Sequence, residues 1–283
     1  MTLAHRKMKF NPKAVEWTKP FKRGYPSGQR GRRVSVYLDG DVAELVGIHL
    51  GDGCLSITRN YQEYALSGDL SEEREYLERW VIPMFNEKVA IPLLGKPIKG
   101  KPNPINGVYG FHIFNPKVVQ YFIKLGLKHG SKMEATIPPE ILRSKRLVKR
   151  LLRGLFDTDG TIYFEKNYSI KQSKHKRPKI KIGLTSPKLA LQVKEALEDL
   201  GFHPMWKKPY KGKRDLNPVY SIVLHRKSDI QKWFYEVGFK NPKHQTKLQI
   251  WREFGSCPPK TKIAERKKLL RAVTLSNLRP FKR

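Results

Sequence analysis

A nine-residue pattern occurs twice in this chain, and each copy ends in aspartate followed by glycine. The first copy is Leu45-Val-Gly-Ile-His-Leu-Gly-Asp-Gly53, and the second is Leu152-Arg-Gly-Leu-Phe-Asp-Thr-Asp-Gly160. The aspartates before the final glycines, Asp52 and Asp159, are 159 − 52 = 107 residues apart. That distance is close to the length of a small domain, so the repeat predicts a chain built from two related halves.

Small residues recur at i and i+4 within each copy: Gly47 with Gly51, and Gly154 with Thr158. Residues at this spacing lie on one face of an α-helix. A face without bulky side chains lets two backbones approach each other closely. We therefore predict that each copy forms a helix, and that the two helices pack through Gly47, Gly51, Gly154 and Thr158.

The two acids are expected at the ends of these helices. Gly53 and Gly160, which follow them, are expected to stop the helices in the left-handed conformation. A carboxylate at a helix C-terminus opposes the helix dipole, and packing the helices side by side brings the two carboxylates together. A divalent cation between them would explain the arrangement, so we predict a metal site at Asp52 and Asp159.

These residues resemble the LAGLIDADG homing endonucleases, specifically the single-chain members that carry both motif copies. The residues that fall on the family's motif positions are Gly47, Asp52, Gly53, Gly154, Asp159 and Gly160. The first copy departs from the family pattern at His49 and Leu50, where many members have an apolar residue and an acid. We expect His49 to be a packed or partly exposed helix residue rather than a metal ligand.

The order of predicted elements also repeats. In the first half we expect strands at 55–59 and 63–67, a helix at 72–86, strands near 91–98 and 108–114, and a helix at 116–125. In the second half we expect strands at 161–165 and 179–184, a helix at 187–200, strands near 205–210 and 219–225, and a helix at 228–237. Tyr109 and Tyr220 are matching landmarks, 220 − 109 = 111 residues apart.

The predicted fold class is therefore α+β. The resemblance implies two pseudo-symmetric αββαββα halves with saddle-shaped antiparallel sheets, packed through a parallel pair of motif helices, and it covers roughly residues 40–255. We expect a basic N-terminal arm at 1–40, the first half at 41–140, the second half at 141–256, and a basic C-terminal tail at 257–283 with a short helix at 263–275.

The charge of the chain points to nucleic acid. Lys and Arg number 57 against 25 Asp and Glu, a formal net charge of +32. Such an excess destabilises a compact chain unless a polyanion is its partner. An anionic membrane surface is the alternative, but no apolar stretch reaches the roughly 18 residues of a membrane span. We expect a monomer that binds double-stranded DNA inside the cell, in the cytoplasm of a prokaryote or archaeon or in an organelle of a eukaryote.

The predicted strands supply the DNA-binding surface. In the run 179–184, Ile180, Ile182 and Leu184 alternate with Lys179 and Lys181, so the lysines face outward. An antiparallel sheet with polar residues on its outer face can lie in the major groove and read base edges. We expect DNA contacts from Ser56, Thr58, Arg59, Lys99, Lys101, His112, Tyr163, Lys179, Lys181 and His225.

The resemblance implies a site-specific double-strand DNA endonuclease that cuts a long asymmetric target and leaves 3′ overhangs. Asp52 and Asp159 would bind Mg²⁺, for which Mn²⁺ can substitute, and the carbonyl groups of Gly51 and Thr158 are further candidate ligands. Hard divalent cations prefer such oxygen ligands. Lys181 and His112 are candidates for a basic residue that assists at the site.

Two alternatives use the same scaffold. The chain could be an RNA maturase that binds intron RNA and assists splicing, or a DNA-binding protein that has lost cleavage. The presence of both aspartates disfavours the second. A phosphate-loop spacing at 95–101 is rejected, because Pro102 stands where the loop needs Ser or Thr and because no helix is expected after it. Cys54 and Cys257 form neither a disulfide framework nor a zinc site.

Overall fold

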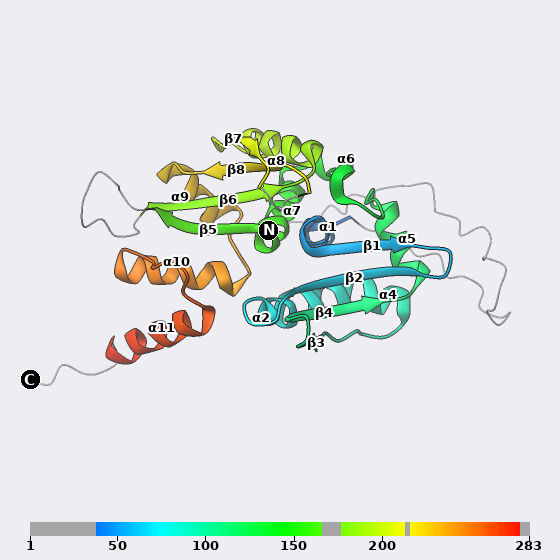
Figure 1. The fold of residues 1–283 in the computed structure, drawn as a ribbon, viewed down its shortest axis with the longest axis horizontal. Helices are drawn as coiled ribbons and strands as arrows, with labels where there is room; N and C mark the ends of the chain where they lie inside the picture. The colour runs from blue at the N-terminus through cyan, green and yellow to red at the C-terminus, as the bar shows by residue number, and fades with distance from the viewer. Residues whose placement is uncertain (1–37, 166–176, 213–215, 278–283) are drawn as a thin grey trace, which may run out of the picture.

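Two four-stranded antiparallel sheets lie on either side of a central pair of helices, α1 and α7 (Figure 1). The computed structural model describes residues 38–165, 177–212 and 216–277, so the predicted N-terminal arm lies almost wholly outside the described residues. The sheets have matching strand orders, β1-β2-β4-β3 and β5-β6-β8-β7.

The first half begins with α1 (Gly40–Asp52), which leads directly into β1 (Gly53–Ile57) and β2 (Gln62–Asp69). A long helical segment follows, made of α2 (Arg74–Tyr76), the π-helical turn η1 (Leu77–Val81), α3 (Ile82–Phe85), the π-helical turn η2 (Asn86–Ala90) and α4 (Ile91–Leu94). Then come β3 (Lys101–Asn103), β4 (Val108–Ile113) and α5 (Pro116–Lys124). The short helices η3 (Lys132–Glu134) and α6 (Pro139–Leu142) connect the halves.

The second half begins with α7 (Lys145–Thr158), followed by β5 (Gly160–Glu165) and β6 (Arg177–Leu184). It continues with α8 (Pro187–Asp199), β7 (Met205–Tyr210), β8 (Val219–Leu224) and α9 (Lys227–Glu236). Both halves thus have the predicted order of elements, and the prediction of an α+β fold with two αββαββα halves is confirmed.

One predicted strand is wrong. Residues 91–94 continue the preceding helix as α4, which ends at Gly95 in the left-handed conformation (φ 72°), and the strand of this region is β3. The apolar run Ile91-Pro-Leu-Leu94 reads as a strand, but Pro92 lies inside the continuous helical segment, just after the π-helical turn η2, and its ring cannot donate a helical hydrogen bond there. Because α4 precedes the loop at 95–100 and β3 follows it, the phosphate-loop geometry is absent there, as expected.

The predicted left-handed stop after each motif helix is also wrong. Gly53 is extended (φ −77°, ψ 158°), and Gly160 is not among the glycines with positive φ in the described residues. Glycine is needed for space instead. A Cβ atom on Gly53 would lie 2.3 Å from Nδ1 of His49, and one on Gly160 would lie 2.3 Å from the carbonyl oxygen of Phe156. In each motif copy the backbone therefore turns directly from helix into strand, with the glycine packed against the last helical turn.

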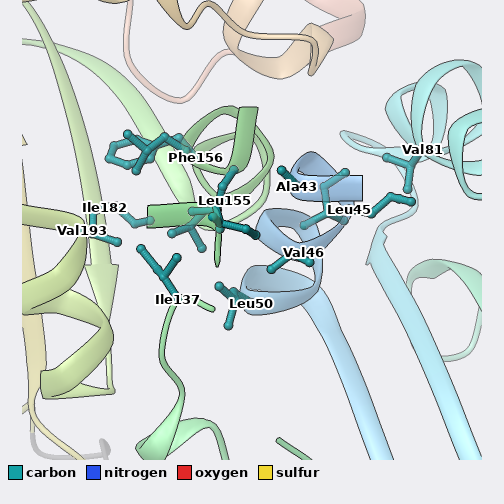
Figure 2. Packing of buried hydrophobic residues seen from close by; sticks show 14 of the residues in the cluster. Ala43, Leu45, Val46, Leu50, Val81, Ile137, Leu155, Phe156, Ile182 and Val193 are labelled. Carbon is teal, nitrogen blue, oxygen red and sulfur yellow. The ribbon is translucent and has the colours of Figure 1, made fainter. Parts of the chain in front are cut away.

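Helix α1 is the centre of the core, because every residue from Val42 to Gly51 is buried. Figure 2 shows Leu155 of α7 on the side of α1 that carries Ala43 and Val46, and Leu45 on the side toward Val81. On the outer side of α7, Phe156 packs with its ring centroid 4.6 Å from that of the fully buried Trp233. A helix that is apolar on all sides must be enclosed by other elements, which fits its place between the two sheets.

Two further helices follow the repeat, and one of them was not predicted. α10 (Pro242–Phe254) comes directly after the second half, and α11 (Ile263–Asn277) confirms the short helix expected in the C-terminal tail. Figure 1 shows α10 beside β5 of the second half, with α11 packed against α10 on the side away from that sheet. Within the described ranges, no helix is long and apolar enough to cross a membrane.

Candidate functional site

The motif helices pack through the predicted small residues. A Cβ atom on Gly47 would lie 2.0 Å from the carbonyl oxygen of Leu151, and one on Gly154 would lie 2.3 Å from that of Glu44. Both distances are far below a van der Waals contact, so only glycine allows this approach. Contacts further along α1 meet residues further along α7, and the helices are therefore parallel, as predicted.

A buried ion pair also joins the two helices. Glu44 of α1 is fully buried, and its carboxylate accepts hydrogen bonds from Arg153 of α7 at 2.5 Å and from the indole of Trp80 at 2.7 Å. Burial raises the pKa of Glu44, although the Arg153 charge lowers it. Removing one partner of such a pair leaves an uncompensated buried charge, so the pair fixes how the helices sit together.

The two aspartates lie where α1 and α7 end and the first strand of each sheet begins. A Cβ atom on Gly51 would lie 3.5 Å from Cγ of Asp159, which shows how near the two helix ends are. Burial, together with the negative charges of Glu73 and Asp159, raises the pKa of Asp52 to about 7. Asp159 is reached by solvent, yet its crowded surroundings partly desolvate it and raise its pKa as well.

Two lysines from outside the motifs contact the residues before the aspartates. The Lys132 ammonium donates a hydrogen bond to the carbonyl oxygen of Gly51. The Lys243 ammonium donates one of 2.9 Å to the carbonyl oxygen of Thr158. Gly51 and Thr158 hold the same position in the two motif copies, so each half of the site has its own lysine. Burial lowers the pKa of Lys132, against the attraction of the two aspartates.

Neither lysine was predicted to lie at the site, although the sequence carries a signal for both. They are 243 − 132 = 111 residues apart, the same offset as Tyr109 and Tyr220. Lys132 and Lys243 are thus a repeated pair in their own right. Lysine is so frequent in this chain that one matching pair carries little weight until the fold places it beside the aspartates.

A third acid, Glu73, lies near the same place. It is buried in the connection between β2 and α2, and its carboxylate accepts a hydrogen bond of 2.9 Å from the backbone N–H of Asp69. The same carboxylate forms an ion pair with Lys243 and contributes to the raised pKa of Asp52. No motif contains Glu73, and nothing in the sequence pattern singled it out.

The donor atoms of the site suit a hard divalent cation. Two neighbouring carboxylates with raised pKa values, such as Asp52 and Asp159, are stabilised when a cation replaces the proton. The carbonyl oxygens of Gly51 and Thr158 each have a second lone pair beside the one that accepts the lysine hydrogen bond. Among the described residues no group of three or more His, Cys, Asp or Glu side chains is arranged to hold a metal ion.

The other acid of the second motif copy has a structural task. Asp157 is fully buried, and its carboxylate accepts hydrogen bonds from the backbone N–H groups of Lys240 and Asn241 at 2.8 and 3.1 Å. Burial raises its pKa in spite of these bonds. Asp157 therefore ties α7 to the start of α10. The first copy has Leu50 at this position, and His49 beside it is buried and stacks on Phe122, as predicted for a packed residue.

The outer face of the first sheet is nearly neutral at its centre. Ser56 lies opposite Glu63 on the neighbouring strand, and Nδ1 of His112 is 2.6 Å from the Glu63 carboxylate. His112 thus pairs with an acid on the sheet. The remaining residues of this half for which we predicted DNA contacts are all exposed: Thr58 and Arg59 after β1, Lys99 before β3, and Lys101 on β3.

The outer face of the second sheet is more basic. Lys181 lies opposite Thr161, and Lys179 lies opposite Tyr163 with its ammonium 2.5 Å from the Glu165 carboxylate. Both lysines point away from the buried isoleucines, as the alternation predicted. His225 is exposed just beyond β8. The structure thus gathers Tyr163, Lys179 and Lys181 on one face.

The chain matches one family model in sequence, and solved structures of homing endonucleases share its fold. Residues 146–238 match the family model described as a LAGLIDADG-like domain. The chain is similar to the homing endonuclease I-DmoI in complex with DNA and Mn, with 16% identity and a TM-score of 0.50 over 70% of this chain and 96% of that chain. For I-DmoI with DNA and Ca the identity is 16% and the TM-score 0.50, over 70% and 88% of the two chains. At this identity the likeness shows the fold. No curated protein sequence matches the chain.

Proposed function

We propose that this LAGLIDADG protein, with both motif copies in one polypeptide, is a homing-type DNA endonuclease that cuts both strands of a long asymmetric target. One observation carries the proposal. Two aspartates lie close together at the ends of packed helices, and each has a lysine ammonium on the preceding carbonyl group. Support also comes from I-DmoI, which shares the fold and was solved with DNA and divalent metals.

Asp52 and Asp159 would hold Mg²⁺, or Mn²⁺ in its place, with the carbonyl groups of Gly51 and Thr158 as further ligands. A bound divalent cation lowers the pKa of a coordinated water and neutralises charge on the phosphate. The chain's own residues place the two carboxylates beside each other and keep bulky side chains out of the space between the helices. Each aspartate would serve the cleavage of one strand, and the offset cuts would leave 3′ overhangs.

Lys132 and Lys243 would supply positive charge next to the phosphodiester. Fixed cations near developing negative charge stabilise a transition state for phosphoryl transfer. Each ammonium is already directed at the carbonyl group beside its aspartate, so little rearrangement is needed when DNA enters. We therefore assign these two lysines, in place of Lys181 and His112, as the basic residues that assist at the two halves of the site.

The unlike outer faces of the sheets support an asymmetric target. Gly53 pairs with Leu66 in the first sheet and Gly160 pairs with Ile182 in the second. Glu63 and Lys179, three residues before those partners, therefore occupy the same place in the two sheets with opposite charge. A carboxylate accepts hydrogen bonds from base amino groups, whereas a lysine donates to guanine or phosphate. The two halves would read different bases, and the protein would act as a monomer on its DNA inside the cell.

Cleavage should depend on pH through Asp52. Its pKa of about 7 means that a proton occupies the carboxylate below that pH, and a metal must displace it. Raising the pH removes the proton that competes with the metal for the carboxylate. We expect the Mg²⁺ concentration for half-maximal cleavage to be about tenfold higher at pH 6 than at pH 8 and to change little above pH 8. Metal-free DNA binding, measured across the same range, is the control. A Mg²⁺ requirement that is constant from pH 6 to pH 8 would contradict this.

The function itself is tested by cutting a randomised duplex library and sequencing the products. We expect one long asymmetric site with 3′ overhangs. Binding of the selected duplex and of a random duplex should then be compared at several salt concentrations. If about ten phosphates are neutralised, both show a log–log slope near −9. The selected duplex should keep its advantage at physiological salt and lose about 1–3 kcal/mol per mismatched contacted pair. Equal affinity for both duplexes would leave only a general nucleic-acid binder.

A further inference from the structure

Each site lysine belongs to a segment that leaves its own half and is held by the opposite half. Lys132 lies in η3, after the last helix of the first half. The hydroxyl of Ser186 donates a hydrogen bond of 2.9 Å to the carbonyl oxygen of Ala135, and the backbone N–H of Ile137 donates one of 2.8 Å to Gln192. Ser186 lies at the connection from β6 into α8 of the second half, and Gln192 lies within α8.

Lys243 has the reciprocal arrangement. It lies in the first turn of α10, after the last helix of the second half. Its ammonium pairs with Glu73, which lies between β2 and α2 of the first half. The buried guanidinium of Arg266 reinforces this contact, because Nη2 is 3.1 Å from the Glu72 carboxylate and 3.4 Å from the Lys243 carbonyl oxygen.

The two arrangements use the same connection in each half. Both Glu73 and Ser186 lie between the second strand of a sheet and the helix that follows it. Glu73 makes a charged contact with the Lys243 side chain. Ser186 makes a neutral contact with the backbone of Ala135, three residues after Lys132. A misplacement of 1 Å at a reacting group can cost about 10²-fold in rate, so such contacts matter for a side chain as flexible as lysine.

We infer that Glu73 and Ser186 are positioning residues that act across the halves: Glu73 sets the place of Lys243, and Ser186 with Gln192 sets the place of Lys132. Each half of the protein therefore controls the cleavage step that the other half's lysine assists. The inference rests on the proposed function. It means that the two strand cuts are coupled through the pairing of the halves and are separable by single substitutions.

The test measures the cut of each strand on the duplex selected with the full chain, labelled with a different fluorophore on each strand. The variants are Glu73→Gln on one side and Ser186→Ala and Gln192→Ala on the other. We expect each to slow one strand about tenfold or more relative to the other, so that nicked duplex accumulates. The strand slowed by Glu73→Gln should be the opposite of the strand slowed by Ser186→Ala and Gln192→Ala. Gln192→Glu, which keeps an acceptor for the Ile137 N–H, should restore balance.

Two surface variants serve as matched controls. Glu75→Gln removes a neighbouring acid that pairs with Lys267. Lys188→Ala removes an exposed pair with Glu134, whose side chain is 59% exposed. Both should cut the two strands equally, because ion pairs that solvent reaches contribute little. The assay is run at pH 8, where Asp52 is ionised with or without the Glu73 charge, so its protonation does not change the comparison.

Chemical labelling of lysines gives a second reading that needs no cleavage. A limiting amine-reactive ester is added to the full chain, and the labelled positions are quantified by mass spectrometry. Glu73→Gln should raise the labelling of Lys243 alone, and Ser186→Ala and Gln192→Ala that of Lys132 alone. If the labelling of the two lysines changes as expected but the wild-type protein cuts no DNA, the proposed function is refuted, whereas the positioning contacts are supported. Equal slowing of both strands, or unchanged labelling of the two lysines, would overturn the inference.

Discussion

Replacing Gly47 by alanine should lower the free energy of unfolding by about 3 kcal/mol or more, at the upper end of the usual cost of overpacking. The new methyl group would meet the Leu151 carbonyl oxygen at 2.0 Å. Backbone cannot rotate away as a side chain can, so α1 and α7 must move apart along the seam that fixes both halves. Gly154→Ala meets the Glu44 backbone at 2.3 Å and should behave alike. Denaturant unfolding measures the loss.

The matched control is Gly40→Ala, at the start of the same helix and facing the same partner. Its Cβ atom would lie 3.4 Å from the flexible side chain of Arg150, which is an ordinary contact. We expect a change within about 0.5 kcal/mol, the usual range for a harmless surface substitution. If Gly47→Ala unfolds at the same denaturant concentration as Gly40→Ala, the helices do not pack through this glycine.

The largest effect on activity is expected for Asp52→Asn and Asp159→Asn. Each should abolish double-strand cleavage, because an amide holds a cation far less well than a carboxylate and the metal chemistry of one strand is lost. DNA affinity in the absence of metal should change little, since we expect it to come from lysines and arginines along the sheets. Cleavage is measured on supercoiled plasmid, which separates nicked from linear product, and affinity by a gel-shift titration.

Asp199→Asn, an exposed acid at the end of α8, is the control and should cut like the wild type. Nicking of one strand by a single variant agrees with the assignment, since the other aspartate is intact. Full linearisation by either variant at the wild-type rate would remove that aspartate from the site.

The small residues of the helix pair and the two aspartates were predicted from the sequence, because the patterns that indicate them are local. The small residues at i and i+4 and the Asp-Gly endings sit within nine-residue segments, and helix geometry alone places them on one face and at one end. The repeat then doubled the pattern, and the strand alternation placed Lys179 and Lys181 outward. Net charge, a property of composition, pointed to a polyanion before any fold was considered.

Other features were decided only by the tertiary structure. The apolar run at 91–94 has the composition of a strand, but it continues a helix whose neighbours cover it. Gly53 and Gly160 are explained by crowding against the preceding helical turn, and not by a left-handed backbone. Periodicity cannot distinguish these cases, because both depend on what packs against the segment.

Lys132 and Lys243 are the clearest case of site residues that the sequence did not predict. The contact between Lys132 and Gly51 joins residues 81 apart, and that between Lys243 and Glu73 joins residues 170 apart. No local pattern connects residues at such separations, and a lysine-rich chain offers many equivalent candidates. The sequence by itself determined the two acids and the seam that brings them together, because both follow from helix geometry. The folded chain alone decided which basic groups stand beside them and which half holds each one, because those choices depend on loops that meet only after the two halves pack.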